Sequence, residues 1–149
     1  MREIKFRGKA IVGKRGVRTI EGKWVYGDLG HMNIDTLSKS MITCYLDDDL
    51  RHSFFIKEKT VGQYTGLKDK NGKEIYEGDI IANDSFKSMS AHIIGEVTYN
   101  CKTCCYEVCV SKEEEYLNIS LSAAVRGILS AYVAGNIYDN PGLLKEGKE

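Results

Sequence analysis

Four of the five cysteines of the chain fall within nine consecutive residues. Cys101 and Cys104 have the Cys-x-x-Cys spacing, in which two thiolates hold one edge of a tetrahedral zinc site. Cys109 is a third candidate ligand, and His92 or Cys44 would be the fourth. The sequence has no second Cys-x-x-Cys and no His-x-His pair to complete such a site. Zinc binding is therefore one interpretation of the cluster, because cysteine is also a common buried residue.

A β-hairpin is the alternative interpretation of the same segment. The chain would turn at 101–104 and return along 106–110, with Tyr106 on one face of the strand and Cys105 and Cys109 on the other. The number of cysteines is odd, and the N-terminal residues do not have the pattern of a secretion signal. We therefore expect free thiols in a reducing cytoplasm unless a metal holds them.

Basic side chains gather at the start of the chain, although the net charge of the protein is zero. Residues 1–23 carry eight basic and two acidic side chains, a net charge of +6. In the opening strand these cations alternate with Ile4 and Phe6, so one face could follow a row of phosphates. A solvated strand face that protects a sheet edge explains the same pattern. The candidate nucleic-acid ridge comprises Lys5, Arg7, Lys9, Lys14, Arg15 and Arg18.

Aromatic side chains offer a second candidate surface. Nine tyrosines in a small protein provide amphipathic area suited to binding a partner. The candidate partner surface comprises Trp24, Tyr26, Tyr64 and Tyr76. The first three of these are also available to stack on nucleic-acid bases.

The function hypotheses follow from these clusters. The sequence contains no Gly-x-Ser-x-Gly motif and no Gly-rich phosphate loop, and it gives no reason to expect catalytic residues or a cofactor. A non-enzymatic binding module for a protein partner is the first hypothesis. Nucleic-acid binding through the basic ridge is the second, and the neutral net charge counts against it. A zinc-binding or enzymatic protein centred on the cysteine hairpin is the third.

Short apolar runs between turn signals predict a mainly β fold, α+β at most. The sequence of strands and Gly-Asp turns favours a barrel-like arrangement similar to SH3 domains, an analogy that concerns fold alone. One short helix is predicted near residues 120–129, where apolar residues recur with helical spacing. Residues 30–52 are polar enough for a long loop or a small excursion from the barrel. The length suits a single domain over 1–149 or two small β subdomains, about 1–57 and 58–149.

The segment from Val61 to Ile81 contains the clearest local signal. Asp69-Lys70-Asn71-Gly72 has Asp first and Gly last in a four-residue turn between apolar runs, which predicts a β-hairpin. This segment, Met1–Arg7 and the tail Val133–Leu144 together resemble the YopX family of small phage and prophage proteins. The resemblance implies a mobile-element protein of the bacterial host cytoplasm with a mostly β fold. It implies no catalytic residues.

Expectations about partners combine the resemblance with the composition. The phage context favours a host or phage protein as the partner. No segment has the length of apolar sequence that a membrane span needs, so a membrane is not expected as a partner. Exposed strand edges make a homo-oligomer an additional expectation.

Overall fold

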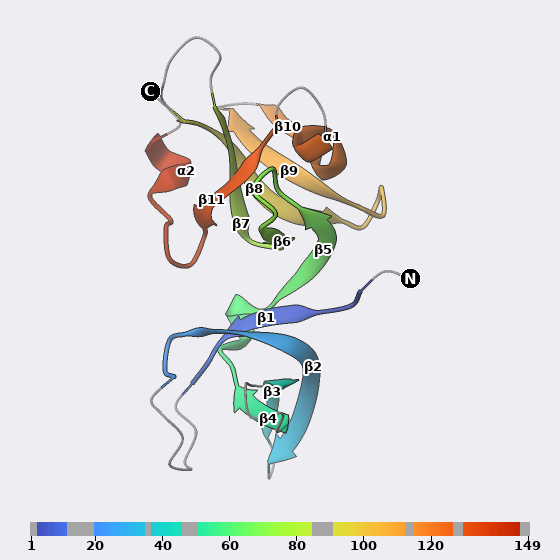
Figure 1. The fold of residues 1–149 in the computed structure, drawn as a ribbon, viewed down its shortest axis with the longest axis vertical. Coiled ribbons are helices and arrows are strands. Elements are labelled where there is room, and N and C mark those ends of the chain that lie inside the picture. The colour runs from blue at the N-terminus through green and yellow to red at the C-terminus, as the bar shows by residue number, and fades with distance from the viewer. Residues whose placement is uncertain are drawn as a thin grey trace. The chain divides into compact units, whose positions relative to one another are not determined.

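A computed structural model describes residues 3–11, 20–34, 37–45, 51–84, 91–112, 115–126 and 130–146 of the chain. It divides into two compact units, Met1–Tyr64 (unit 1) and Thr65–Glu149 (unit 2). The division falls inside the strand β5 (Gly62–Lys68) and so lies later in the chain than residue 57. Figure 1 follows the chain through the strands of each unit.

Unit 1 is an antiparallel sheet with the strand order β4-β3-β2-β1-β5. A single 3-10 turn, η1, stands before the last strand. The elements are β1 (Phe6–Lys9), β2 (Trp24–Ile34), β3 (Leu37–Tyr45), β4 (Arg51–Phe55), η1 (Glu58–Thr60) and β5 (Gly62–Lys68). The last residues of β5 belong to unit 2, where this strand pairs with β6 (Glu74–Tyr76).

The core of unit 1 forms where the sheet curls. Ala10 and Ile42 are 0% exposed and Ile56 is 3% exposed. A bridge joins Ala10 to Ile56, so the end of β1 meets the chain just after β4. Gly8 allows this close approach, because a Cβ there would lie 2.8 Å from the Ile56 Cδ1 atom and 3.1 Å from its Cβ atom, and the Ile56 side chain would have to shift.

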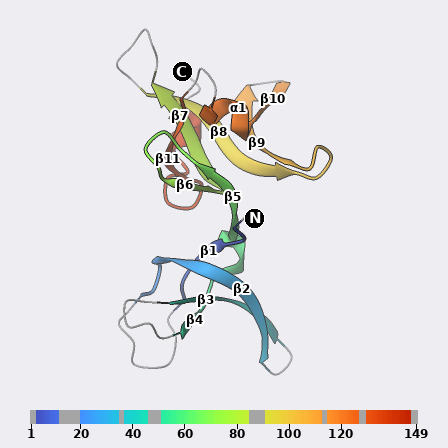
Figure 2. The same ribbon diagram turned by 45° about the vertical axis from the view of Figure 1, so that its right-hand side comes forward.

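Unit 2 contains a five-stranded antiparallel sheet in the order β10-β9-β8-β7-β11. Two short helices accompany it. The elements after β6 are β7 (Asp79–Asp84), β8 (Ala91–Asn100), β9 (Cys105–Lys112), β10 (Glu115–Ser120), α1 (Leu121–Arg126), β11 (Tyr132–Asn136) and α2 (Leu143–Glu146). Figure 2 shows β8 and β9 as a long curved hairpin with α1 against β9 and β10.

The core of unit 2 lies between the sheet and α1. The side chains of Val97 and Val108 point from β8 and β9 toward Leu121 and Ala124 of the helix, and all four residues are 0% exposed. Ile75, Ile81, Ala131 and Val133 complete the cluster. The hydrophobic face of the hairpin is therefore what anchors the helix.

The structure confirms the mainly β class and the short helix, since α1 lies within the predicted range. Residues 30–52 were expected to form a loop or an excursion. In the described part of this range they instead continue β2, form β3 and begin β4, and the three strands pair antiparallel with one another. The barrel-like form is not confirmed. Among the described residues, the edge strands of neither sheet pair with each other to close a barrel.

A buried carboxylate ties the predicted turn of unit 2 to the strand β11. Asp69 is 6% exposed, and its Oδ1 atom accepts hydrogen bonds from the backbone N–H groups of Asn71 (2.8 Å) and Lys73 (2.9 Å). Its Oδ2 atom accepts one from the N–H group of Val133 (3.0 Å). Gly72 closes the turn at φ +82°, a conformation that glycine adopts without strain. The turn residues therefore fix both the hairpin and the position of a strand 64 residues away.

We predict that Asp69→Ala destabilises unit 2, because the buried N–H group of Val133 loses its acceptor. The free energy of unfolding should fall by about 1–3 kcal/mol. Urea unfolding followed by far-UV circular dichroism measures this change, and hydrogen exchange at the Val133 amide locates it. Lys73→Ala is the matched control, because it keeps the backbone N–H group and removes only an exposed side chain. Unchanged protection of the Val133 amide in Asp69→Ala would contradict the assignment.

Candidate functional site

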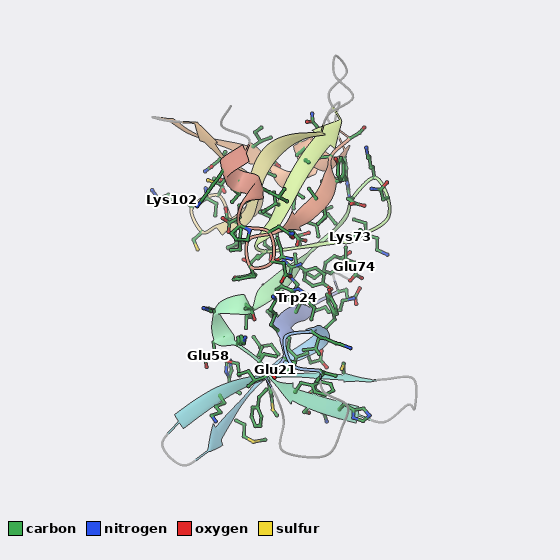
Figure 3. The ribbon with its side chains drawn as sticks, turned by 90° about the vertical axis from the view of Figure 1, so that its left-hand side faces the viewer. Glu21, Trp24, Glu58, Lys73, Glu74 and Lys102 are labelled. Atoms are coloured by element: carbon green, nitrogen blue, oxygen red, sulfur yellow. The ribbon has the colours of Figure 1, made fainter. Side chains whose placement is uncertain are left out.

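The four cysteines of the β8–β9 hairpin differ in their position and in their exposure to solvent. Asn100 and Cys105 are the last paired residues, and 101–104 form the turn between them. Cys101 and Cys104 are exposed at this tip, whereas Cys105 and Cys109 are half-buried on β9. Lys102 marks the tip in Figure 3. The predicted hairpin is thus confirmed, as is the position of Tyr106 on the opposite, core-facing side.

The geometry keeps the candidate zinc ligands apart. Cys109 lies four residues beyond Cys105 along β9, about 13 Å at roughly 3.3 Å per residue. Zinc–sulfur bonds are about 2.3 Å long, so Cys109 cannot join Cys101 and Cys104 around one ion. In the described part of the chain no three Cys, His, Asp or Glu side chains are grouped closely enough to hold a metal. Of the proposed fourth ligands, Cys44 belongs to unit 1 and the side chain of His92 lies outside the described residues.

A carboxylate that the sequence did not single out organises the tip. Glu107 on β9 is 8% exposed. It accepts hydrogen bonds from Asn100 Nδ2 (2.8 Å), Thr103 Oγ1 (2.8 Å) and, more weakly, Cys105 Sγ (3.7 Å). The hydrogen bonds from Asn100 and Thr103 hold the pKa of the Glu107 carboxyl below its usual value. The only sequence signal was the alternation of β9, which places Glu107 on the same face as the two strand cysteines.

A second carboxyl on this face has the opposite shift. Burial raises the pKa of Glu96, which pairs with Cys109, while Thr98 pairs with Glu107. The two glutamates are thus diagonal neighbours, roughly 7–8 Å apart on adjacent strands. Carboxyl groups with opposed pKa shifts can serve as general acid and base. Both oxygens of Glu107, however, are engaged by the turn, so the geometry supports a structural role for this residue.

The basic strand and the aromatic residues of unit 1 form one face, which we call the cation–aromatic face. Lys9 pairs with Trp24 across β1 and β2, and Arg7 pairs with Tyr26. The Cζ atom of Arg7 lies 4.7 Å from the centre of the Trp24 ring, and the Nζ atom of Lys9 lies 5.5 Å from it. These distances are typical of cation–π contacts. Figure 3 labels Trp24 at this face.

Lys5 extends this face along the other neighbour of β1. Its Nζ atom lies 5.6 Å from the centre of the Tyr64 ring on β5. The candidate ridge and the candidate partner surface, inferred separately from the sequence, therefore coincide in part. The remaining ridge residues, Lys14, Arg15 and Arg18, lie outside the described residues.

Three of the candidate side chains are less accessible than the sequence suggested. Arg7 was expected on a solvated strand face but is 5% exposed, because aromatic side chains lie beside it on the same face. Tyr64 and Tyr76 were expected to contact a partner but are 5% and 2% exposed. Tyr76 tolerates burial because its hydroxyl group donates to Glu74 Oε2 (2.7 Å). Tyr26, at 45% exposed, remains the accessible aromatic residue of the four.

A polar cluster in unit 1 was missed by the sequence analysis. The Oγ atom of Ser40 lies 3.2 Å from His31 Nδ1 and 3.4 Å from Glu58 Oε1. In a catalytic triad the histidine stands between the serine and the carboxylate. Here the serine is central and is 5% exposed, which suits a structural link between β2, β3 and η1. The pairing of His31 with Ser40 depends on the register of β2 with β3, which no pattern in the sequence indicates.

The described fold and these contacts define a mainly β protein of two antiparallel units, with carboxylates that organise turns and a cation–aromatic face on the first sheet. The model of the YopX protein family matches residues 15–145. The chain therefore belongs to the YopX family. The matched range includes the turn segment and the tail that carried the resemblance, and it begins after Met1–Arg7.

Two further comparisons concern solved structures and curated proteins. Among solved structures, the chain is similar to the crystal structure of protein EF1440 from Enterococcus faecalis, at 22% sequence identity and a TM-score of 0.42, covering 95% of this chain and 98% of that one. Among curated proteins, none matches. Within the described residues, no helix combines the length and apolar character that crossing a bilayer requires.

We predict that Glu107 makes the stability of unit 2 depend on acid pH. Its folded-state pKa lies below the unfolded value of about 4.3, so its contribution is complete above that pH and is lost as pH falls through the folded pKa. Glu107→Gln should therefore lower the urea midpoint at pH 7, and its difference from the wild type should shrink between pH 5 and 3. Glu21→Gln, which alters an exposed carboxyl group, is the control. A constant difference at every pH would overturn this assignment.

Proposed function

We propose that this YopX protein is a phage- or prophage-encoded accessory protein that acts in the host cytoplasm as a non-enzymatic binding module for a protein partner. The observation that supports this proposal best is the exposed ring of Tyr26 on the cation–aromatic face. Tyrosine, tryptophan and arginine are the residues that most often dominate the affinity of protein interfaces. Tyr26 and Trp24 lie on this face, and the buried guanidinium of Arg7 packs beside the Trp24 ring.

The face is also held in place before a partner arrives. Trp24 is contacted by two cations, and the strand pairing of β1 with β2 fixes the backbone beneath Arg7 and Tyr26. A surface whose side chains are already ordered loses less conformational entropy on binding. This arrangement favours recognition by a stable surface over recognition by a flexible loop.

The polar groups support a non-enzymatic role. Both carboxylate oxygens of Asp69 and both of Glu107 accept hydrogen bonds that organise turns. Asp79, at 1% exposed, accepts a hydrogen bond from the backbone N–H group of Tyr76 (2.8 Å). Ser40 links His31 and Glu58 from a buried position. Asp69, Glu107, Asp79 and Ser40 thereby each have a structural role.

We predict that Tyr26→Ser weakens partner capture. Tagged protein is incubated with nuclease-treated extract of a bacterial host, and retained proteins are quantified by mass spectrometry and then tested in purified form. Truncating a central interface aromatic residue costs about 2 kcal/mol or more, so affinity for the purified partner should fall at least roughly 10-fold. Tyr99→Ser is the matched control, since Tyr99 is exposed to 42% but belongs to unit 2.

Two outcomes would count against this proposal. One is retention of the same proteins by Tyr26→Ser and the wild type. The other is self-association through this face, detected as a dimer by light scattering that Tyr26→Ser converts to a monomer, which would make a second copy the partner.

Nucleic-acid binding is the second candidate function. The observation in its favour is that Lys5, Arg7 and Lys9 project from the same face of β1, with Tyr26 exposed beside them. The contacts of these cations with Trp24 and Tyr64 weigh against it, because rings already covered by cations are less available to bases.

We predict that the double variant Lys5→Gln/Lys9→Gln separates the two candidates. Fluorescence anisotropy of labelled single- and double-stranded DNA is measured over a series of salt concentrations. If the ridge contacts phosphates, the slope of log affinity against log salt should fall by roughly 2 in the double variant. Lys59→Gln, which alters an exposed lysine of η1, is the control. The binding-module proposal predicts no DNA binding, even at low salt.

A further inference from the structure

Two thiols at the tip of the β8–β9 hairpin remain outside every role described so far. Cys101 and Cys104 occupy the first and last positions of the turn, directly beyond the paired residues Asn100 and Cys105. Both are exposed and both are free thiols. The ends of a four-residue turn have their Cα atoms within about 7 Å, and disulfides span Cα distances of about 4.4–6.8 Å. The backbone therefore already brings the two cysteines to bridging range.

The side chain of Cys104 is turned toward its counterpart. Its Sγ atom lies 3.6 Å from the backbone oxygen of Cys101. Its backbone has φ +52°, a left-handed conformation that side chains other than glycine and asparagine rarely adopt. In the described part of the chain only Ser130 shares this property among residues other than glycine. Strained residues of this kind cluster at functional sites.

The neighbouring Cys105 is engaged differently. Its Sγ atom lies 3.1 Å from Thr103 Oγ1 and 3.7 Å from Glu107 Oε1, on the sheet face below the turn. Thr103 also donates to Glu107, and the backbone N–H group of Lys102 donates to Asn100 Oδ1 (2.9 Å). The two residues between Cys101 and Cys104 are therefore already fastened to the strands. The turn that carries the two tip cysteines is thereby held against β8 and β9.

We propose that Cys101 and Cys104 form a reversible dithiol–disulfide site that exchanges with low-molecular-weight disulfides such as glutathione disulfide. One cysteine thiolate attacks a sulfur of glutathione disulfide; a mixed disulfide forms, and one glutathione leaves as a thiolate that takes up the released proton. The second cysteine then attacks the mixed disulfide at the protein sulfur and releases the second glutathione. Two protein thiols are oxidised, and one glutathione disulfide is reduced to two glutathione molecules.

The oxidised tip differs from the reduced tip in a defined way. The bond closes a ring around Lys102 and Thr103 and replaces the contact of the Cys104 thiol with the Cys101 carbonyl oxygen. Thr103 continues to connect this ring to Glu107. Tyr99 and Tyr106, in edge-to-face contact with ring centres 5.2 Å apart, form the paired rings just below the turn. The redox state therefore changes the exposed surface of the hairpin end while the strands stay paired.

The experiment uses the whole chain in glutathione buffers of graded reduced-to-oxidised ratio. Samples are quenched in acid, denatured, alkylated with N-ethylmaleimide and weighed by mass spectrometry. The wild type should lose two of its five alkylatable thiols in one transition. Trypsin cleaves after Lys102, between the two cysteines, so the bridge should hold residues 88–102 and 103–112 together until a reductant is added.

Single variants identify the sulfurs involved. Cys101→Ser and Cys104→Ser should each stop at a mixed disulfide with glutathione, whereas Cys105→Ser and Cys109→Ser should keep the bridge. Far-UV circular dichroism checks that each variant is folded. Mixed disulfides alone in the wild type, or a linked peptide pair that persists in Cys104→Ser and disappears in Cys105→Ser, would overturn the proposal.

Discussion

The carboxylate of Asp69 is the constraint on which the architecture of unit 2 most depends. A negative charge removed from water is stable only where hydrogen bonds replace its hydration. Three backbone N–H groups do so, two from the turn that follows and one from Val133 on β11. This hydrogen bond fixes β11, the edge strand of the sheet, to a hairpin that is far away in the sequence. Two segments that carried the family resemblance separately are thus parts of one hydrogen-bonded arrangement.

The same physical logic recurs in the β8–β9 hairpin. Alternation along β9 sends Val108 into the core and Glu107 to the opposite face, where side chains of the turn surround it. The sequence predicted this alternation correctly, together with the turn at 101–104. It could not predict that Asn100 and Thr103 converge on Glu107, because that depends on the conformation of the turn. Local periodicity thus determines faces, whereas register and turn geometry determine the contacts made on them.

Unit 1 shows where local pattern and tertiary contact diverge. The alternation of cations with Ile4 and Phe6 in the opening strand was recognisable, and so was the supply of aromatic residues. Strand pairing then placed Arg7 beside Trp24, which covers the guanidinium and removes it from the solvated row. The burial of Tyr76 was equally difficult to predict, since it depends on tertiary contacts such as the hydrogen bond from its hydroxyl group to Glu74. Amphipathic side chains take either environment, and the identity of the neighbour decides which.

These contacts also bear on how function is distributed over the molecule. Groups engaged in buried hydrogen bonds or cation–π contacts are poorly suited to proton transfer or nucleophilic attack, because reacting would break the interactions that hold the fold. Among the described residues, the accessible chemistry with an argued role lies in the ring of Tyr26 and in the tip thiols of Cys101 and Cys104. The first presents aromatic area, and the second presents two exposed thiols. They belong to different units, each of which has buried core residues of its own.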